Sequence, residues 1–327
     1  MRTPEISLLF RNVNISRDLV FFLKSIRYID KITSESPEIE IVLHDREQVW
    51  QNEWFPPTGS RLSLTLKYRE ESNYIEANGF EIDKLDFSFD GNGDTLRLRG
   101  QQTPFSKSLR EKRSVEYENV TLRGLIDTIA QRQGLTVQGT VAEITFERLT
   151  QNEQSDLEFL TRLAEDYGHI IKIEGDNLII YSWDQLNSEP ADFTIDREQI
   201  NKFRASKKLV GIYRAARIVY EKTDDENRSE FEIEAQRPND SEDVLVINQR
   251  SESPAQSEAI AKEKLRKANA DEWKGDVNME GEYWQRAGVN INIESFGQFD
   301  GKWQIQEVEH NFTPDRGWSS RLKVHKL

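Results

Sequence analysis

The spacing of apolar residues changes its period twice along this chain, and this limits the folds that it can adopt. In residues 38–98 apolar and polar residues alternate, most clearly over 62–68, as expected for strands with one buried face. The Asp-Gly-Asn-Gly-Asp run at 90–94 indicates a hairpin turn. From Val120 the apolar spacing becomes helical, and from Tyr213 it returns to alternation. The sequence therefore predicts an α+β chain that is mostly β.

The middle region, residues 114–185, is predicted to contain two helices and a hairpin. The first helix follows Val120 and ends at Gly134. The second begins after Ser155, whose side chain can form a capping box with Glu158, and it ends at Gly168, which can take a positive φ. Its apolar residues recur at helical spacing and define one buried face: Leu157, Leu160, Leu163, Ala164 and Tyr167. A hairpin at 171–180 completes this small α+β unit.

The last region, residues 186–327, is predicted to be a second set of strands interrupted by one helix at about 253–273. Ser253 is an N-cap candidate, Pro254 suits the first helical position, and Gln256 would complete a capping box. Later the alternating phase slips at Val308, which indicates a β-bulge. Polar segments on either side of the middle region are expected to be linkers, which gives predicted domains at 1–113, 114–185 and 186–327 with linkers at 101–113 and 186–192.

The run Q-N-E-x-S-D-x-x-F-L-x-x-L-A-E-x-Y-G at 151–168 resembles the late control gene D family of contractile-tailed phages, which includes the hub portion of VgrG proteins. Two further blocks, 23–59 and 297–310, resemble the first tube domain and the last strands of that family, in the same order. The positions that carry the resemblance are expected to have structural roles: Gln151, Glu153, Ser155, Asp156, Phe159, Leu160, Leu163, Ala164, Gly168, Gly301 and His310.

The resemblance implies a structural baseplate hub protein with two small β-barrel tube domains and an inserted α/β domain. The expected partners are two more copies in a homotrimer, a separate trimeric spike protein, the hexameric tail tube protein and other baseplate proteins. Such a hub would adapt six-fold to three-fold symmetry around a central passage. It would be made in the cytoplasm and assembled into a phage tail or an injection-system particle. Tube-domain edges and middle-domain helices are where subunit and spike contacts are expected.

Charge and composition narrow the possible functions. The chain has 58 acidic and 44 basic residues, a net charge of −14, so it lacks the general attraction to phosphates on which nucleic-acid binding depends. Sequence-specific nucleic-acid binding is therefore not expected, and a net-acidic passage wall would repel a passing polyanion. The apolar run at 19–23 is too short for a transmembrane span. The absence of cysteine excludes disulfides and thiolate chemistry.

No catalytic, cofactor-binding or metal-binding residue is predicted. Acidic residues are so abundant that no carboxylate pair stands out, and those in the second helix are interpreted as capping residues or a solvated face: Asp156, Glu158, Glu165 and Asp166. The four histidines have no metal-ligand spacing, and His310 is expected to pack or to form hydrogen bonds. The seven tryptophans are expected in cores and interfaces, and the charged run 262–267 on the wet face of a helix.

Two functions of other classes remain as alternatives. One is a tail-associated cell-wall hydrolase, which a peptidoglycan-hydrolysis assay would detect. The other is a host-surface or glycan-binding module, which binding to cell envelopes would detect.

Overall fold

The computed structural model describes residues 2–327 with gaps at 12, 20, 58, 92, 103–110, 175, 222–227, 235–238, 240 and 250. Contacts divide the chain into two compact units. Unit 1 consists of Met1–Thr103, Ala191–Arg204 and Gly275–Lys326, and unit 2 is built mainly from Pro104–Pro190 and Ala205–Lys274. The region 186–327 thus contributes residues to both units, while its predicted status as one domain stays a prediction.

One large sheet organises unit 1, and the prediction of a mostly β chain is confirmed. Thirteen of the described strands belong to this sheet, whose path runs β14-β18-β21-β20-β3-β4-β7-β6-β5-β1-β2, with β19 beside β20 and β13 beside β19. The strands are β1 Pro4–Phe10, β2 Val13–Asn14, β3 Leu23–Lys31, β4 Glu38–His44, β5 Arg61–Tyr68, β6 Tyr74–Asp90, β7 Gly93–Gln102, β13 Phe193–Ile195, β14 Ile200–Lys207, β18 Trp273–Glu280, β19 Asn290–Ile293, β20 Gly301–Thr313 and β21 Gly317–Lys326. The short helices are α1 Ser16–Leu19, η2 Arg197–Gln199 and η3 Gly297–Phe299.

The alternating sequence pattern places one face of the N-terminal strands in a core. Strand β4 pairs with β7 so that Ile41 faces Leu98, and both side chains are buried. The other buried members of this core include Leu64 and Phe80. The predicted hairpin at 90–94 is confirmed, because Asp90 of β6 faces Gly93 of β7.

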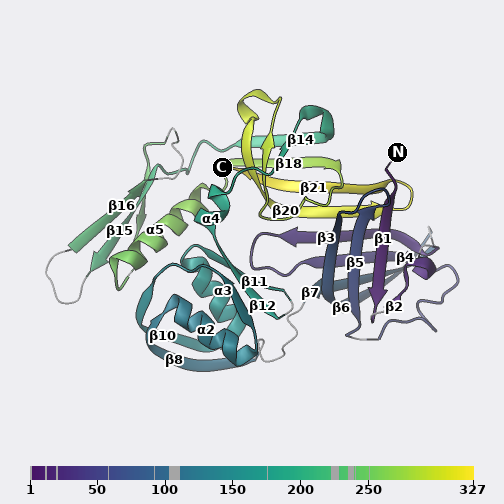
Figure 1. Ribbon diagram of the computed structural model, residues 1–327, viewed down its shortest axis with the longest axis horizontal. Helices are drawn as coiled ribbons and strands as arrows, with labels where there is room; N and C mark the ends of the chain where they lie inside the picture. Colours follow the sequence, from purple (N-terminus) through teal and green to yellow (C-terminus); the bar gives the residue numbers. More distant parts are fainter. Residues whose placement is uncertain are drawn as a thin grey trace. The chain divides into compact units, whose positions relative to one another are not determined.

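Strands from the two ends of the chain join within the same sheet. Strand β20 pairs antiparallel with β3, which brings His310 opposite Tyr28, and Figure 1 draws these strands side by side. Strand β20 also forms a hairpin with β21, and the register shifts between Ile305 and Glu307. The predicted bulge is therefore confirmed, and it keeps both Ile305 and Val308 buried on the core side.

The first part of unit 2 is the predicted pair of helices with strands. Helix α2 (Leu122–Gln133) ends at Gly134 with φ 70°, and helix α3 (Asp156–Asp166) is followed by Gly168 with φ 73°, as predicted. Their buried side chains share one core with residues of the hairpin β11–β12. The strands are β8 Lys112–Thr121, β9 Thr136–Gly139, β10 Thr145–Ser155, β11 His169–Glu174 and β12 Asn177–Ser182, and helix α4 spans Trp183–Ser188.

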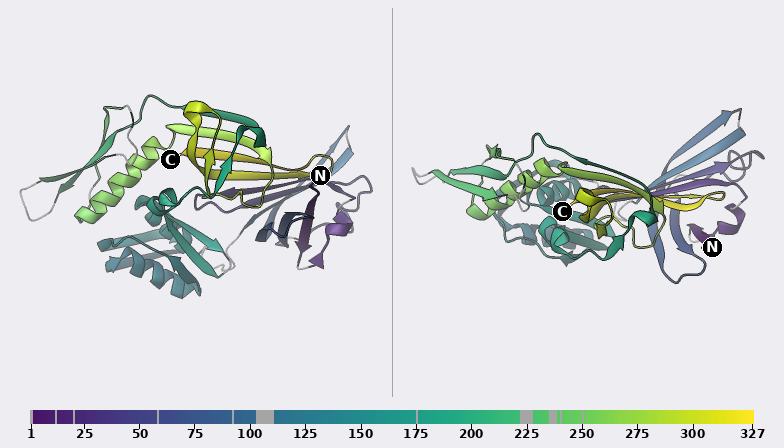
Figure 2. Two further views of the ribbon diagram at one scale, coloured as in Figure 1. Left: turned by 45° about the horizontal axis from the view of Figure 1, so that its top comes forward. Right: turned by 90° about the horizontal axis from the view of Figure 1, so that it is seen from above.

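The second part of unit 2 is a three-stranded sheet that packs on one helix. Strand β15 (Ala215–Glu221) lies between β16 (Arg228–Glu234) and β17 (Val244–Ile247). Helix α5 (Pro254–Asn269) packs along β15 and β16, as Figure 2 shows. Ile218 of the sheet and Ile260 of the helix belong to the core between them.

Helix α5 differs from its prediction at both ends. It ends at Asn269 rather than near 273, because the Asn269 side chain accepts from the Tyr213 backbone N–H at 2.9 Å and donates to its carbonyl at 2.6 Å. Ser253 caps the helix as predicted, but the Gln256 side chain accepts from the Glu252 backbone N–H at 2.9 Å instead of completing a capping box. The Gln256 amide also donates to the Thr145 carbonyl at 2.6 Å.

Three further predictions need correction or fall outside the described part. The charged run 262–267 is not wholly solvated, because Glu263 and Leu265 are buried. The expected linker 186–192 begins inside α4, which continues to Ser188. In the expected linker 101–113, the first two residues belong to β7, the last two to β8, and residues 103–110 lie outside the described residues.

Candidate functional site

The family-like run 151–168 forms the end of β10 and the whole of α3. The predicted capping box is confirmed: the Ser155 hydroxyl accepts from the Glu158 backbone N–H at 3.2 Å, and the Glu158 carboxylate accepts from the Ser155 backbone N–H at 2.9 Å. Of the predicted apolar face, Leu160, Leu163 and Ala164 are buried in the unit 2 core together with Phe159, whereas Leu157 and Tyr167 are half-buried.

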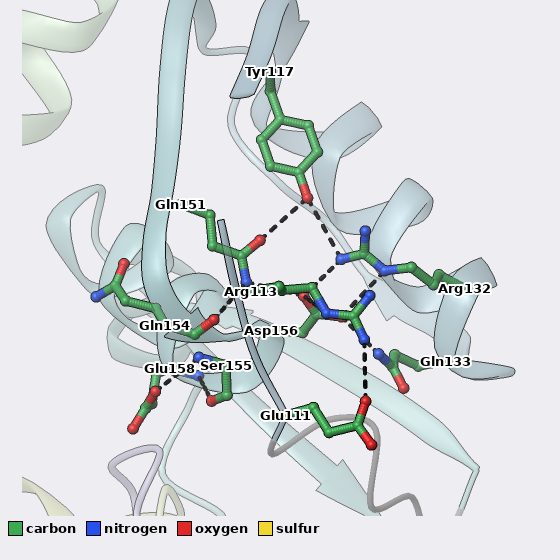
Figure 3. Close-up of polar contacts among 10 residues, drawn as sticks. All are labelled: Glu111, Arg113, Tyr117, Arg132, Gln133, Gln151, Gln154, Ser155, Asp156 and Glu158. Carbon is green, nitrogen blue, oxygen red and sulfur yellow. Dashed lines mark hydrogen bonds and ion pairs between the residues drawn. The ribbon is translucent and has the colours of Figure 1, made fainter. Parts of the chain in front are cut away.

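Asp156 contradicts its interpretation as a capping or solvated residue, because its side chain is 0% exposed. Arg132 Nη2 donates to its Oδ1 at 2.6 Å, and Gln133 Nε2 donates to its Oδ2 at 2.6 Å. Gln151 Nε2 donates to Oδ1 at 3.0 Å, and the Arg113 guanidinium lies 3.8 Å from the same oxygen. Figure 3 shows these side chains converging on the carboxylate from β8, α2 and β10. A buried carboxylate requires such partners.

This environment keeps Asp156 ionised. Burial alone would raise its pKa, but hydrogen bonds from Gln151, Gln133 and Arg132 outweigh that effect and leave the pKa below its ordinary value. A carboxylate with lowered pKa and saturated hydrogen bonds is a poor proton donor or acceptor for catalysis. The cluster therefore connects helix α2 to the start of helix α3 through buried hydrogen bonds.

Gln151 and Glu153 shape the end of strand β10, which leads into the Asp156 cluster. Gln151 is buried, and its Oε1 accepts from the Tyr117 hydroxyl at 3.3 Å while its Nε2 donates to the Gln154 carbonyl at 2.9 Å. Between these residues the β8–β10 register shifts, and Glu153 takes φ 48°. Its backbone N–H donates to the Ser114 hydroxyl at 3.1 Å. The polar residues of the run thus form a β-bulge and a buried hydrogen-bond network.

Sequence reasoning missed the partners of Asp156. Arg113, Arg132 and Gln133 lie 23 to 43 positions away in the chain, and a charged residue in the last turn of α2 normally suits the helix dipole at the surface. The available signal was Asp156 itself, since it lies beside the N-cap on the side where Phe159 and Leu160 are apolar. Whether the predicted positions are shared by the family stays a prediction.

The two remaining predicted residues, Gly301 and His310, belong to strand β20 in unit 1 and do not join the Asp156 cluster. Gly301 has φ 123°, a conformation that disfavours other residues, and it begins the strand. His310 is buried, as its predicted packing role requires. Its Nδ1 accepts from Trp318 Nε1 at 3.1 Å, and its Nε2 lies 2.9 Å from the Gln285 carbonyl.

These contacts fix the protonation of His310. An indole N–H only donates, so Nδ1 carries no proton and Nε2–H donates to the carbonyl. The Ser320 hydroxyl also lies 2.7 Å from Nδ1, and the Tyr28 ring stacks on the imidazole. Burial lowers the pKa of His310 to about 4, so the ring is neutral at physiological pH.

The sheet of unit 1 carries a network of cross-strand ion pairs on the face opposite the core. Glu40 of β4 lies 3.0 Å from Arg99 and 3.7 Å from Arg97, both on β7. Arg27 of β3 lies 2.6 Å from Glu309 of β20. The network continues across strands through Asp86–Arg99, Lys323–Glu307 and Arg321–Asp276, and Lys84 pairs with Asp86 along β6. The acidic residues of this face are therefore largely neutralised by bases on neighbouring strands.

Among the described residues no group of three or more His, Cys, Asp or Glu side chains could hold a metal ion. No described helix is long and apolar enough to cross a membrane. Of the tryptophans, Trp50, Trp183, Trp303 and Trp318 are buried as predicted, whereas Trp54 is about half exposed beside Phe22.

Comparisons with known proteins agree with the resemblance seen in the sequence. No family model matches the chain. A probable baseplate hub protein of Escherichia phage 186 is 26% identical over 178 residues, which are 54% of this chain and 44% of that protein. A probable baseplate hub protein of Escherichia phage P2 is 25% identical over 180 residues, with 54% and 45% covered. Each match thus covers less than half of the curated relative.

Solved structures show the same fold along nearly the whole chain. A 43 kDa tail protein of prophage MuSo2 from Shewanella oneidensis has a TM-score of 0.70 at 13% identity, with 99% of this chain and 98% of that chain covered. A tail protein from Neisseria meningitidis MC58 has a TM-score of 0.69 at 11% identity, with 99% and 97% covered. The predicted relationship to baseplate hub and tail proteins is confirmed.

Proposed function

We propose that the chain is a structural subunit of a phage-type baseplate hub. Three copies would form a ring that joins a hexameric tail tube to a separate trimeric spike protein, with other baseplate proteins around it. The observation that carries the proposal is the fold match over 99% of the chain to a phage tail protein, together with curated relatives named as probable baseplate hub proteins. The particle would be a virion tail or a related injection system.

The geometry of the described residues supports a mechanical role. The buried Asp156 cluster and the His310 cluster each connect elements distant in sequence, and neither presents an ionisable group poised for proton transfer. Both clusters therefore favour a scaffold over the cell-wall hydrolase considered above. A peptidoglycan-hydrolysis assay on the assembled hub is expected to show no cleavage, and measurable cleavage would contradict a purely structural role.

We further propose that the ion-paired face of the unit 1 sheet lines the central passage. Paired charges keep a surface hydrated without a strong field of one sign, so a passing polyanion would neither bind nor be strongly repelled. This replaces the expected net-acidic wall by a charge-balanced one. Replacing Glu40 and Glu309 with Gln would remove the nearest acid of Arg99 and of Arg27, leaving Arg99 with the more distant Asp86 at 3.7 Å, and DNA or cargo release should slow. Unchanged release by particles containing this variant would count against the assignment.

Assembly tests the hub proposal directly. The chain should be co-produced with the spike and tube proteins of its own particle, and the products separated by size. A complex with three copies of this chain bound to the spike is the expected result. Absence of the chain from isolated baseplates would overturn the proposal.

A further inference from the structure

The unit 1 sheet has an open edge along the second half of strand β6. Strand β5 pairs with β6 only as far as Glu81, whereas β7 continues beside β6 to Asp90. The segment 83–89 therefore has a strand neighbour on one side only among the described strands. Open edges of this length are templates for pairing with another chain.

A second open edge lies at the other side of the same sheet. Strand β14 ends the strand path, with β18 as its one neighbour in the described part of the chain. It has eight residues, which is enough to pair with the whole segment 83–89. By contrast, β2 at the far end of the path has only two residues.

The charges of the two edges are complementary. Segment 83–89 contains Asp83 and Asp86 with one base, Lys84, and Asp90 follows it directly. Strand β14 contains Lys202, Arg204 and Lys207 and no acidic residue. Opposite charges on facing strands favour pairing, whereas two copies of the same edge would oppose like charges.

Each edge strand also has an apolar side and a charged side, so the two strands can pair with like sides together. Phe87 faces the buried Leu96 across β6 and β7, so Leu85, Phe87 and Phe89 point to the core side and Asp86 points to the ion-paired side. Phe87 is 49% and Phe89 78% exposed, although both extend the core face.

On β14, Phe203 contacts the rings of Phe296 and Trp303, so it lies on the core side while Lys202 and Arg204 lie on the other. If the two edge strands pair so that their charged sides lie on the same face of the joined sheet, the exposed Phe87 and Phe89 therefore come to lie beside Phe203 on the other face.

We propose that segment 83–89 of one copy pairs with β14 of a second copy of this chain, head to tail. Because the two edges are different strands, each copy still has one open edge after pairing, and a ring closes when the last copy meets the first. The ring of three rests on the proposed hub function, whereas the pairing of these two edges rests on their geometry and charge. Closure would also protect the exposed phenylalanines from water.

The absence of native cysteine allows a direct cross-linking test. Ser88 on β6 and Ser206 on β14 are exposed and lie on the charged side of their strands, so Ser88→Cys and Ser206→Cys introduce thiols near the proposed contact. Particles containing both single variants, treated with a short bis-maleimide, should give a covalent dimer, and particles with each single variant alone should give none. Particles containing the double variant should give linked products up to a closed trimer.

A matched control uses Ser319→Cys, an exposed residue on the interior strand β21. Paired with Ser206→Cys, it should give no dimer. The proposed pairing is overturned if particles that contain the chain yield no Ser88–Ser206 link, or if one single variant cross-links to itself as readily as the mixture. Absence of the chain from the particle would instead refute the hub function. Efficient linking into a ring of another size would refute the trimer and support the edge pairing.

Charge reversal provides a second readout. Lys202→Glu with Arg204→Glu should lower the cross-linked fraction about tenfold or more, because acids would then oppose Asp83 and Asp86. Adding Asp83→Lys with Asp86→Lys should restore much of the yield. Circular dichroism would establish that each variant is folded. If the variant with all four substitutions is folded but does not regain cross-linking, the proposal is contradicted.

Discussion

Replacing Asp156 with Asn should weaken unit 2 strongly, although the two side chains have nearly the same shape. The substitution removes a buried negative charge that accepts from Arg132, Gln133 and Gln151, and it places an amide N–H₂ against at least one of these donors. Breaking a buried ion pair typically costs about 3–5 kcal/mol. The Arg132 side chain is 30% exposed and can regain water, so we expect about 2–4 kcal/mol here.

Hydrogen exchange measured by mass spectrometry can follow this loss within unit 2 alone. At about 1.4 kcal/mol per tenfold change, protection of the α3 amides should fall about 30- to 700-fold in Asp156→Asn. Glu116→Gln is the matched control, because Glu116 forms an exposed ion pair with Arg148 in the same unit and its loss should leave protection unchanged. A decrease of less than about threefold in Asp156→Asn would refute the view that the buried charge joins α2 to α3.

Three further outcomes are expected. The folded pKa of about 4 for His310 lies below its unfolded value of about 6.5, so lowering the pH through this window should cost wild-type unit 1 about 3 kcal/mol that His310→Gln does not lose. Tryptophan fluorescence in urea measures this loss, because five of the seven tryptophans lie in unit 1, and parallel pH profiles would contradict it. Gly281→Ala should destabilise unit 1 by about 3 kcal/mol, because a Cβ there would lie 2.3 Å from the Trp318 ring, whereas Gly91→Ala has open space and should be neutral in thermal unfolding; equal melting temperatures would contradict the close packing. Ser155→Ala should cost about 1 kcal/mol through loss of the N-cap, seen as faster exchange at the first turn of α3, and unchanged exchange would argue against the cap.

Local patterns predicted the elements of this fold well. Alternation identified strands β4 to β7 and β19 to β21 of unit 1 but not β13, β14 or β18. The capping box at Ser155 and the glycines after α2 and α3 located those helices, because each signal depends on residues close in sequence. The bulge in β20 was also readable, since a phase slip is a local property.

Contacts between residues distant in sequence could not be predicted from these local patterns. The burial of Asp156 depends on Arg132 and Gln133, and the end of helix α5 depends on Asn269 contacting Tyr213, 56 positions away. Pairing of β3 with β20 connects residues about 280 positions apart, which no local pattern reveals. The open edges that we propose as subunit contacts became visible only when the strand order was known.

The central claim is that three copies of this chain form the ring between tube and spike. The most direct measurement is native mass spectrometry of the complex isolated with the spike protein of the same particle. The account predicts one species with three copies of this chain for each spike trimer. A stable complex with any other ratio, or no binding between this chain and the spike in intact baseplates, would contradict it.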